Sequence, residues 1–242
     1  MSAWNENPVV LTCAITGADV FRENNPNIPY TTVEVADSAI GAARAGATIV
    51  HLHVREDDGT PSGRPELFVD VIDRIRAASD VLTMVSTGGS NEMTIAERTT
   101  GLEANPDISG VESGSMNFGD ETFITPPPAG IIEAPMTINL VFGVPGGIDA
   151  SPEALDAMLR PLPPETFWTV TCIGRHHQRM LALALLKGAP GIRTGLEDVA
   201  YISRGVHAPS NAALVEMAVG LAGTLGREVA DQAQTRELLG LG

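Results

Sequence analysis

Seven short apolar runs recur along the chain, and between most of them apolar residues return every three or four positions. A short continuous apolar run is typical of a strand buried on both faces, whereas the three-to-four spacing is typical of an amphipathic helix. We therefore predict seven strands, which fall within residues 9–16, 47–54, 81–86, 108–118, 136–142, 167–173 and 191–195.

Helix start and stop residues mark the segments between these strands. Thr31 or Thr32 would cap a helix that has Glu34 in its first turn and ends at Gly46, and Pro152 stands in the first turn of another helix. The predicted helices cover residues 31–45, 65–79, 93–103, a segment from 151, a segment up to 187, and residues 210–226 and 231–239.

Strands that alternate with helices indicate a parallel sheet, and this number of strands favours a TIM-type (β/α)8 barrel made of one domain over residues 1–242. An open doubly wound sheet is the alternative, but no G-x-G-x-x-G turn follows the first strand. The alternation breaks over residues 119–135, which contain three consecutive prolines and no convincing helix and strand.

Composition and charge narrow the class of protein. The 242 residues suffice for one large core, and the net charge of -15 argues against nucleic acid as a partner. Cys13 and Cys172 both lie in apolar runs, so we expect buried thiols and no disulfide. No signal peptide is recognisable, and no apolar run reaches the roughly 18 residues of a membrane span, so we expect a cytoplasmic protein without a membrane partner.

The most informative chemistry lies at the predicted strand ends. His51 and His53 are two positions apart on one strand, so both imidazoles point to the same face where the strand gives way to loop 55–59. Two imidazoles at such a point supply half of a zinc-type site, although two core histidines bonded to their neighbours are the alternative. Barrel enzymes build their active sites at this end of the strands.

Six motifs at the strand ends occur in a fixed order. They are V-H-L-H-V-R at 50–55, S-T-G-G at 86–89, G-S-M-N-F-G at 114–119, V-P-G-G at 144–147, I-G-R-H at 173–176 and G-L-E-D at 195–198. As a set they resemble the β-keto acid cleavage enzyme family, a group of metal-dependent (β/α)8 barrels. Segment 16–31, T-G-A-D-V-F-R-E-N-N-P-N-I-P-Y-T, is similar to members that act on 3-keto-5-aminohexanoate, an intermediate of lysine degradation.

The resemblance implies a reaction in which a β-keto acid and acetyl-CoA give acetoacetate and a new acyl-CoA, in an enzyme that is commonly a homotetramer. It implies that His51, His53 and Glu197 hold Zn2+. It also implies that Asp198 is the general base and that Arg193 orients it. Read alone, Glu197 and Asp198 would be an acidic pair at a helix start, and Arg193 a surface arginine.

Other strand-end residues are candidates to bind the reactants. Ser86, Thr87 and the amides of Gly88 and Gly89 are candidate donors to an oxyanion, or simply turn residues. Asp19 suits a substrate ammonium group, with an Asx-turn as the alternative. Three further candidates at the substrate lie in one segment, at Glu112, Ser115 and Asn117. The CoA phosphates would be bound at a helix start by Arg175, His176 and His177, with a solvated loop as the alternative.

The chain departs from the family pattern in two places. Members carry a further helix and strand, with an acidic P-E-x-E-like motif, in the interval that residues 119–135 occupy here, so we expect the barrel to lack or abbreviate one βα unit after the fourth strand. Gly110 also lacks a hydroxyl that is usual at this point, and Glu112 adds a carboxylate where an amide is usual. Both changes predict an altered substrate pocket or weaker activity.

Two rival functions stay open at this point. One is a metal-dependent barrel lyase, aldolase or hydrolase that does not use CoA. The other is an impaired, non-catalytic barrel that has lost a βα unit.

Overall fold

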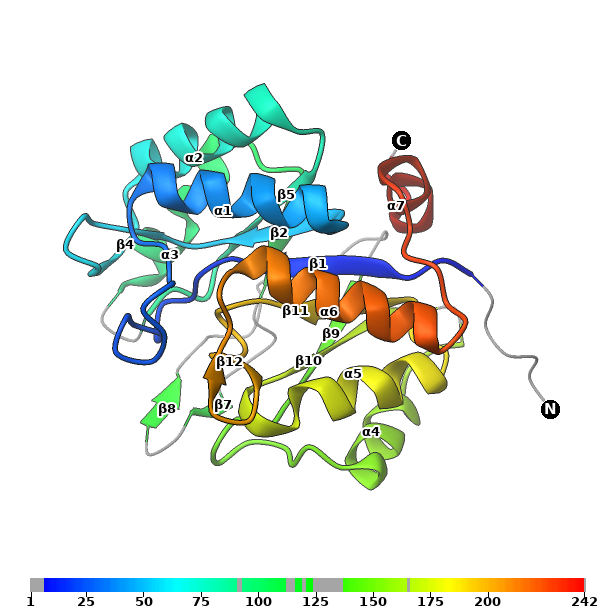
Figure 1. The fold of residues 1–242 in the computed structure, drawn as a ribbon. Helices are drawn as coiled ribbons and strands as arrows, with labels where there is room; N and C mark the ends of the chain where they lie inside the picture. Colours follow the sequence, from blue (N-terminus) through cyan, green and yellow to red (C-terminus); the bar gives the residue numbers. More distant parts are fainter. Residues whose placement is uncertain are drawn as a thin grey trace.

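The computed structural model describes residues 7–90, 93–111, 116–118, 121–123, 137–164 and 166–241, with only the backbone described at 116–118 and 121–123. Its main element is a parallel sheet of seven strands (Figure 1). They are β1 (Val10–Ala14), β2 (Ile49–Leu52), β5 (Leu82–Ser86), β6 (Ile108–Gly110), β9 (Thr137–Phe142), β10 (Phe167–Cys172) and β11 (Gly191–Thr194).

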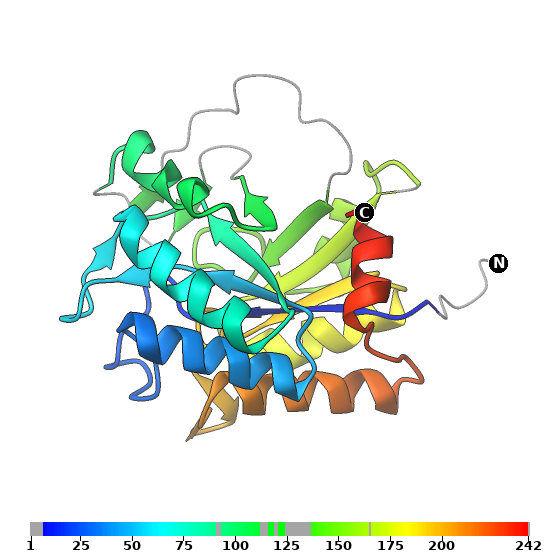
Figure 2. The same cartoon turned by 90° about the horizontal axis from the view of Figure 1, so that it is seen from above.

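The described strands of this sheet follow the order of a (β/α)8 barrel and supply seven of its eight strands. The sheet runs β6-β5-β2-β1-β11-β10-β9, so sequential strands are neighbours and the first strand pairs with the last. Among the described strands, β6 and β9 are the two edges, and a closed barrel would have one more strand between them. The strands curl into a half-barrel, as the view in Figure 2 shows. The predicted TIM-type barrel, with one βα unit lacking or abbreviated after the fourth strand, is confirmed.

The outer face of this half-barrel is covered by α1 (Thr32–Ala45), α2 (Pro65–Ala78), α4 (Pro152–Leu159), α5 (His177–Leu186) and α6 (Asn211–Thr224). The helix α7 (Gln232–Leu239) packs instead on the inner face through Leu239. The other described helices are the short α3 (Ile95–Thr99) and the 3-10 turns η1 (Thr100–Ala104) and η2 (Gly174–His176). Thr31 caps α1 through a capping box with Glu34, and Gly46 ends the helix at φ 118°, as predicted. The single helix predicted over 93–103 is instead the short α3 followed by η1.

Three small antiparallel hairpins complete the described structure. They pair β3 (Val54–Arg55) with β4 (Pro61–Ser62), β7 (Met116–Phe118) with β8 (Glu121–Phe123), and β12 (Tyr201–Ser203) with β13 (Val206–His207). No helix among the described residues is long and apolar enough to cross a membrane.

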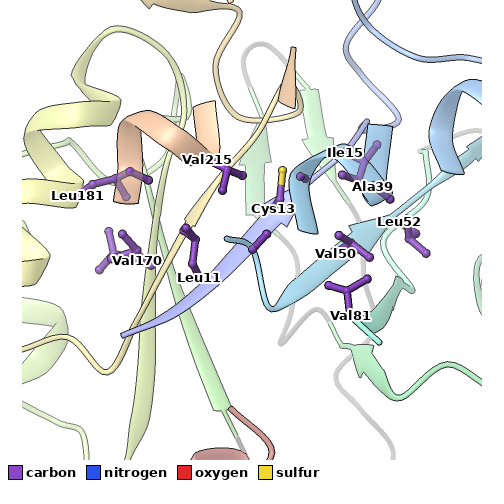
Figure 3. Close-up of a cluster of buried hydrophobic side chains, with 14 of the residues drawn as sticks. Leu11, Cys13, Ile15, Ala39, Val50, Leu52, Val81, Val170, Leu181 and Val215 are labelled. Atoms are coloured by element: carbon purple, nitrogen blue, oxygen red, sulfur yellow. The ribbon is translucent and has the colours of Figure 1, made fainter. Parts of the chain in front are cut away.

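The strand side chains alternate between two environments. Leu11, Val50 and Val170 pack outward against helix residues such as Leu181 and Val215 in the main core (Figure 3). On the inner face, Val10, Ile49 and Leu82 form a second cluster that Leu239 of α7 closes. Positions two residues further along the strands share this inner face. The cluster therefore fills one end of the barrel, and polar inner residues such as His51 follow toward the other end.

Candidate metal centre

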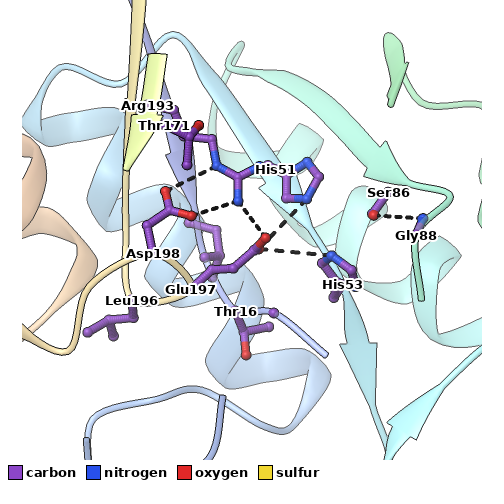
Figure 4. Close-up of polar contacts among 12 residues, drawn as sticks. Thr16, His51, His53, Ser86, Gly88, Thr171, Arg193, Leu196, Glu197 and Asp198 are labelled. Atoms are coloured by element: carbon purple, nitrogen blue, oxygen red, sulfur yellow. Dashed lines mark hydrogen bonds and ion pairs between the residues drawn. The ribbon is translucent and has the colours of Figure 1, made fainter. Parts of the chain in front are cut away.

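His51, His53 and Glu197 converge at the carboxyl end of the sheet (Figure 4). His51 is the third residue of β2, and His53 follows that strand. Glu197 lies three residues after β11, on the far side of β1. The Nε2 atoms of His51 and His53 lie 3.7 Å and 3.9 Å from Oε2 of Glu197, and one ligand atom from each residue lies within 4.8 Å of the others. The three residues predicted as metal ligands are thus brought together.

This donor set fits a divalent metal ion in both spacing and charge. Two ligand atoms each about 2.0–2.1 Å from a tetrahedral Zn2+ lie roughly 3.4 Å apart, close to the observed separations. Burial lowers the pKa of His51 well below its usual value, and it lowers that of His53 to about 3; the nearby Arg193 charge adds to both shifts. Both imidazoles are therefore neutral near pH 7, which is the state that binds a metal.

Arg193 joins the two acidic residues that follow its strand. Its Nε and Nη2 donate to Oδ2 and Oδ1 of Asp198 at 3.1 and 2.8 Å, and Nη2 also donates to Oε1 of Glu197 at 2.5 Å. Burial alone would lower the pKa of Arg193, but the two carboxylates outweigh burial and raise it. Arg193 therefore stays charged and holds one Glu197 oxygen, while the other oxygen faces the imidazoles.

The turn before Glu197 is fixed by contacts that the sequence did not reveal. Gly195 has φ 146°, and a Cβ there would lie 2.0 Å from the carbonyl oxygen of Ala14. The amide of Leu196 donates to Oδ1 of the fully buried Asn211, whose Nδ2 donates to the carbonyl of Ile15 at 2.8 Å. No local motif marks Asn211, because its partners lie far away along the chain.

The S-T-G-G turn ends β5 beside the metal candidates. Oγ of Ser86 accepts the amide of Gly88 at 3.1 Å, which leaves the hydroxyl proton of Ser86 to donate elsewhere. Oγ1 of Thr87 donates to the carbonyl of Gly110 on β6 at 2.6 Å. A small hollow beside His53 is bordered by Ser86 and Gly89 of this turn.

The remaining candidates lie in different surroundings. Asp19 is exposed in the segment after β1, and Arg175 is exposed in η2, where its Nε donates to His176. His177 is unavailable to CoA, because it is buried with its ring nitrogens 2.7 Å from the carbonyl oxygen of Cys172 and 2.8 Å from Oγ1 of Thr194.

The structure does not describe the side chains of the other three candidate substrate residues. Glu112 and Ser115 lie outside the described residues, and Asn117 lies on β7, where only the backbone is described.

Both cysteines are free and buried, as predicted, and burial raises the pKa of Cys172 to about 12.

Comparison with known proteins decides the family. A sequence model of the beta-keto acid cleavage enzyme family matches residues 8–129 and 128–241. The chain belongs to the beta-keto acid cleavage enzyme family. It is 38% identical over 269 residues to the 3-keto-5-aminohexanoate cleavage enzyme of Acetoanaerobium sticklandii, covering 96% of this chain and 98% of that relative. It is 35% identical over 272 residues to the 3-oxoadipate:acetyl-CoA acetyltransferase of Cupriavidus necator, covering 97% and 95%.

A solved structure supports the fold of this beta-keto acid cleavage enzyme family member. The ternary complex of ObcA with C4-CoA adduct and oxalate superimposes with a TM-score of 0.75 at 16% identity, covering 89% of this chain and 68% of that one. The family match also falls into two pieces that meet at residues 128–129, inside the interval between β6 and β9. The alignment with the A. sticklandii relative exceeds the 242 residues of the chain, so that relative carries residues that have no counterpart here.

Proposed function

We propose that this protein is a metal-dependent enzyme that converts a β-keto acid and acetyl-CoA into acetoacetate and a new acyl-CoA. The convergence of His51, His53 and Glu197 carries the proposal, because these neutral nitrogens and this carboxylate come from motifs of a family whose named relatives include an acetyl-CoA acetyltransferase. We propose 3-keto-5-aminohexanoate as the substrate, since relatives 38% identical to the chain are named for its cleavage.

His51, His53 and Glu197 would hold the metal ion, and the nitrogen-rich donor set favours Zn2+. A bound ion of this kind supplies a Lewis acid for the ketone and carboxylate oxygens of a β-keto acid. Arg193 supports this arrangement by binding one Glu197 oxygen, so that the carboxylate keeps its orientation.

Asp198 is the proposed general base. It would take a proton from C2 of the substrate, and Arg193 would orient it through the two hydrogen bonds to its oxygens. C2 then forms a bond to the acetyl carbon of acetyl-CoA, and the C–S bond of the thioester breaks and frees the CoA thiolate. The thiolate adds to C3, the bond between C2 and C3 breaks to give the new acyl-CoA, and C2 takes the proton back from Asp198 as acetoacetate leaves.

The S-T-G-G turn would stabilise the oxyanion that forms on the thioester carbonyl. Ser86 has a hydroxyl proton to donate there, and the amide of Gly89 is a second proposed donor, whereas the amide of Gly88 already donates to Oγ of Ser86. Thr87 would hold the turn against β6 through its bond to Gly110. Arg175 is a proposed contact for the CoA phosphates, since it is exposed at the carboxyl end of β10.

The decisive experiment supplies 3-keto-5-aminohexanoate, 3-oxoadipate and 3-dehydrocarnitine in turn, each with acetyl-CoA, with and without a chelator. We expect acetoacetate and the matching acyl-CoA from the amino substrate, and loss of both products after metal removal. Cleavage without acetyl-CoA would favour a CoA-independent lyase instead. Full turnover by metal-free protein would overturn the proposal.

Asp19 is the proposed partner of the substrate ammonium group. We expect Asp19→Asn to raise KM for 3-keto-5-aminohexanoate about ten-fold, which corresponds to roughly 1.4 kcal/mol of binding free energy, and to leave KM for an analogue without the amino group unchanged. Glu23→Gln is the matched control, because Glu23 is an exposed acidic residue of the same segment. Equal effects of Asp19→Asn on both substrates would count against this role.

By resemblance to the family we also propose a cytoplasmic homotetramer that takes part in lysine degradation. Light scattering of the purified protein tests the oligomeric state, and a monomer at working concentration would refute it.

A further inference from the structure

Arg55 is a fully buried arginine two residues beyond His53, and only 1% of its surface is exposed. Removing a guanidinium from water is costly unless its N–H groups find partners. Burial lowers the pKa of Arg55, while Tyr30 and the charges of Asp19 and Glu197 oppose that shift. The buried guanidinium of Arg55 must therefore be stabilised by specific polar partners.

The guanidinium is wrapped by the segment that follows β1. Nη2 donates to the carbonyls of Gly17, of Ala18 at 3.1 Å and of Val20 at 2.6 Å. Its carbon Cζ also lies 4.9 Å from the centre of the Phe21 ring. One side chain thus fixes the backbone path of residues 17–21.

A second loop is tied to the same group. Nη1 of Arg55 donates to the carbonyl of Gly59 at 2.5 Å, and Cζ lies 5.2 Å from the centre of the Tyr30 ring. Gly59 has φ 92°, and a Cβ there would lie 2.2 Å from that ring, so the loop and the ring are in close contact. Arg55 therefore joins the loop after β3 to the segment after β1.

The wrapped segment borders the metal candidates directly. A Cβ on Gly17 would lie 2.6 Å from Cγ of Glu197, so the backbone of Gly17 packs against this side chain. Ala18 lines the hollow that His53 and Ser86 also border. Asp19 is the next residue, and it is exposed. A shift of this segment would move Asp19 and would loosen the packing on Glu197.

We propose that Arg55 is a positioning residue that holds segment 17–21 as a wall of the substrate site and so sets where Asp19 meets a cationic β-keto acid. This inference rests on the proposed function for the identity of the substrate. The effect of Arg55 on segment 17–21 is independent of the proposed function.

The test compares Arg55→Met and Arg55→Lys with Arg22→Met. Arg22 is the matched control, because it also lies over the Tyr30 ring, at 4.3 Å, but is half-exposed and pairs with Glu34. We expect Arg55→Met to keep one bound Zn2+ per chain and to raise KM for the amino substrate by about ten-fold or more, with a smaller change in kcat. Arg55→Lys would recover part of the loss, and Arg22→Met would behave like wild type.

Limited trypsin digestion gives a readout that is independent of activity. Cleavage after Arg22, identified by fragment mass, would be at least about ten-fold faster in Arg55→Met than in wild type, because proteolysis follows the population of the opened segment. If Arg55→Met does not fold, KM for the amino substrate and the rate of cleavage after Arg22 are measured on Arg55→Lys instead, and they test the inference in the same way. Wild-type KM and wild-type cleavage in a folded, Zn2+-binding variant would overturn the inference. Inactive wild-type protein with fast cleavage of the variant would instead overturn only the proposed function.

Discussion

At the scale of single residues, the site depends on carboxylate oxygens that are divided between two tasks. Glu197 gives one oxygen to Arg193 and turns the other toward His51 and His53. Asp198 gives both of its oxygens to Arg193 and has no exposed side-chain surface. One arginine therefore sets the orientation of a proposed ligand and of the proposed base.

Replacing Glu197 by Gln tests its proposed role as a metal ligand. Gln keeps the size of the side chain but removes its charge, so metal affinity should fall by more than the 10–100-fold that is typical when only a supporting contact is lost. Metal titration followed by elemental analysis measures this. His207→Ala is the control, since His207 is exposed on the β12–β13 hairpin. Unchanged metal content in Glu197→Gln would refute the role.

His177 gives stability a pH dependence of predictable sign. Burial lowers its pKa below the ordinary value of 6.5, so below pH 6.5 the unfolded chain binds a proton that the folded chain does not. The stability that the neutral, buried imidazole of His177 provides is therefore complete above pH 6.5, and it is lost progressively as the pH falls below 6.5. We expect the unfolding free energy to decrease by up to about 1.4 kcal/mol per pH unit for this residue.

Urea denaturation between pH 7.5 and 5 measures that dependence. His177→Asn cannot take up the proton, so its unfolding free energy should fall less steeply over this range. Equal slopes for the two proteins would contradict the assignment.

At the scale of secondary-structure elements, Asn211 at the start of α6 connects three parts of the fold. It accepts the amide of Leu196 before Glu197, and it donates to Ile15 beyond β1 and to Oγ of Ser38 on α1. The turn that presents Glu197 is therefore held by a helix residue in addition to its own backbone bonds, in which the amides of Asp198 and Val199 donate to the carbonyl of Gly195.

Asn211→Ala should destabilise the fold and disturb the metal candidates together. The variant leaves the buried amide of Leu196 without this acceptor, which costs about 1–3 kcal/mol of unfolding free energy. Metal affinity should fall as well. Ser210→Ala is the control, because Ser210 caps the same helix through the amide of Ala213 and its loss costs about 1 kcal/mol. An Asn211→Ala variant that binds metal like Ser210→Ala would show that the helix does not position Glu197.

The sequence predicted the elements well where local signals and tertiary contacts agree. The capping box at Thr31 and Glu34 marks α1 correctly. The prediction over 93–103 was less accurate, because Thr94 does start a helix but the chain turns into a 3-10 helix and reaches a left-handed conformation at Asn105. His177 was grouped with Arg175 by sequence, whereas the start of α5 directs it into the core.

The candidate site was predictable only in part for a related reason. His51, His53 and Glu197 stand in motifs, so their residue types and strand-end positions could be recognised. Arg55 and Asn211 act through backbone carbonyls and amides of distant segments, and no side-chain pattern records such contacts.

At the scale of the whole molecule, the charge of -15 surrounds a site proposed for two anionic reactants. Long-range repulsion of acetyl-CoA is screened by salt, with a Debye length of about 10 Å at 0.1 M. We expect KM for acetyl-CoA to fall as NaCl rises from about 0.01 to 0.15 M, the range over which the Debye length shrinks from about 30 to 8 Å. Steady-state kinetics at each salt concentration measure this KM. Na2SO4 at matched ionic strength serves as the second salt. A KM that rises with salt would mean that local cations such as Arg175 dominate the field.

The pairing of β1 with β11 also has a consequence for the order of events in the cell. His51 and His53 leave the ribosome before Glu197 and before β11, the strand that brings Glu197 beside them. During translation the nascent chain can assemble β1, β2 and β5, but it has only two of the three proposed metal ligands until β11 and Glu197 are made. Capture of the proposed metal would therefore follow the synthesis of Glu197, and a product truncated before this residue would be metal-poor even if its first strands had paired.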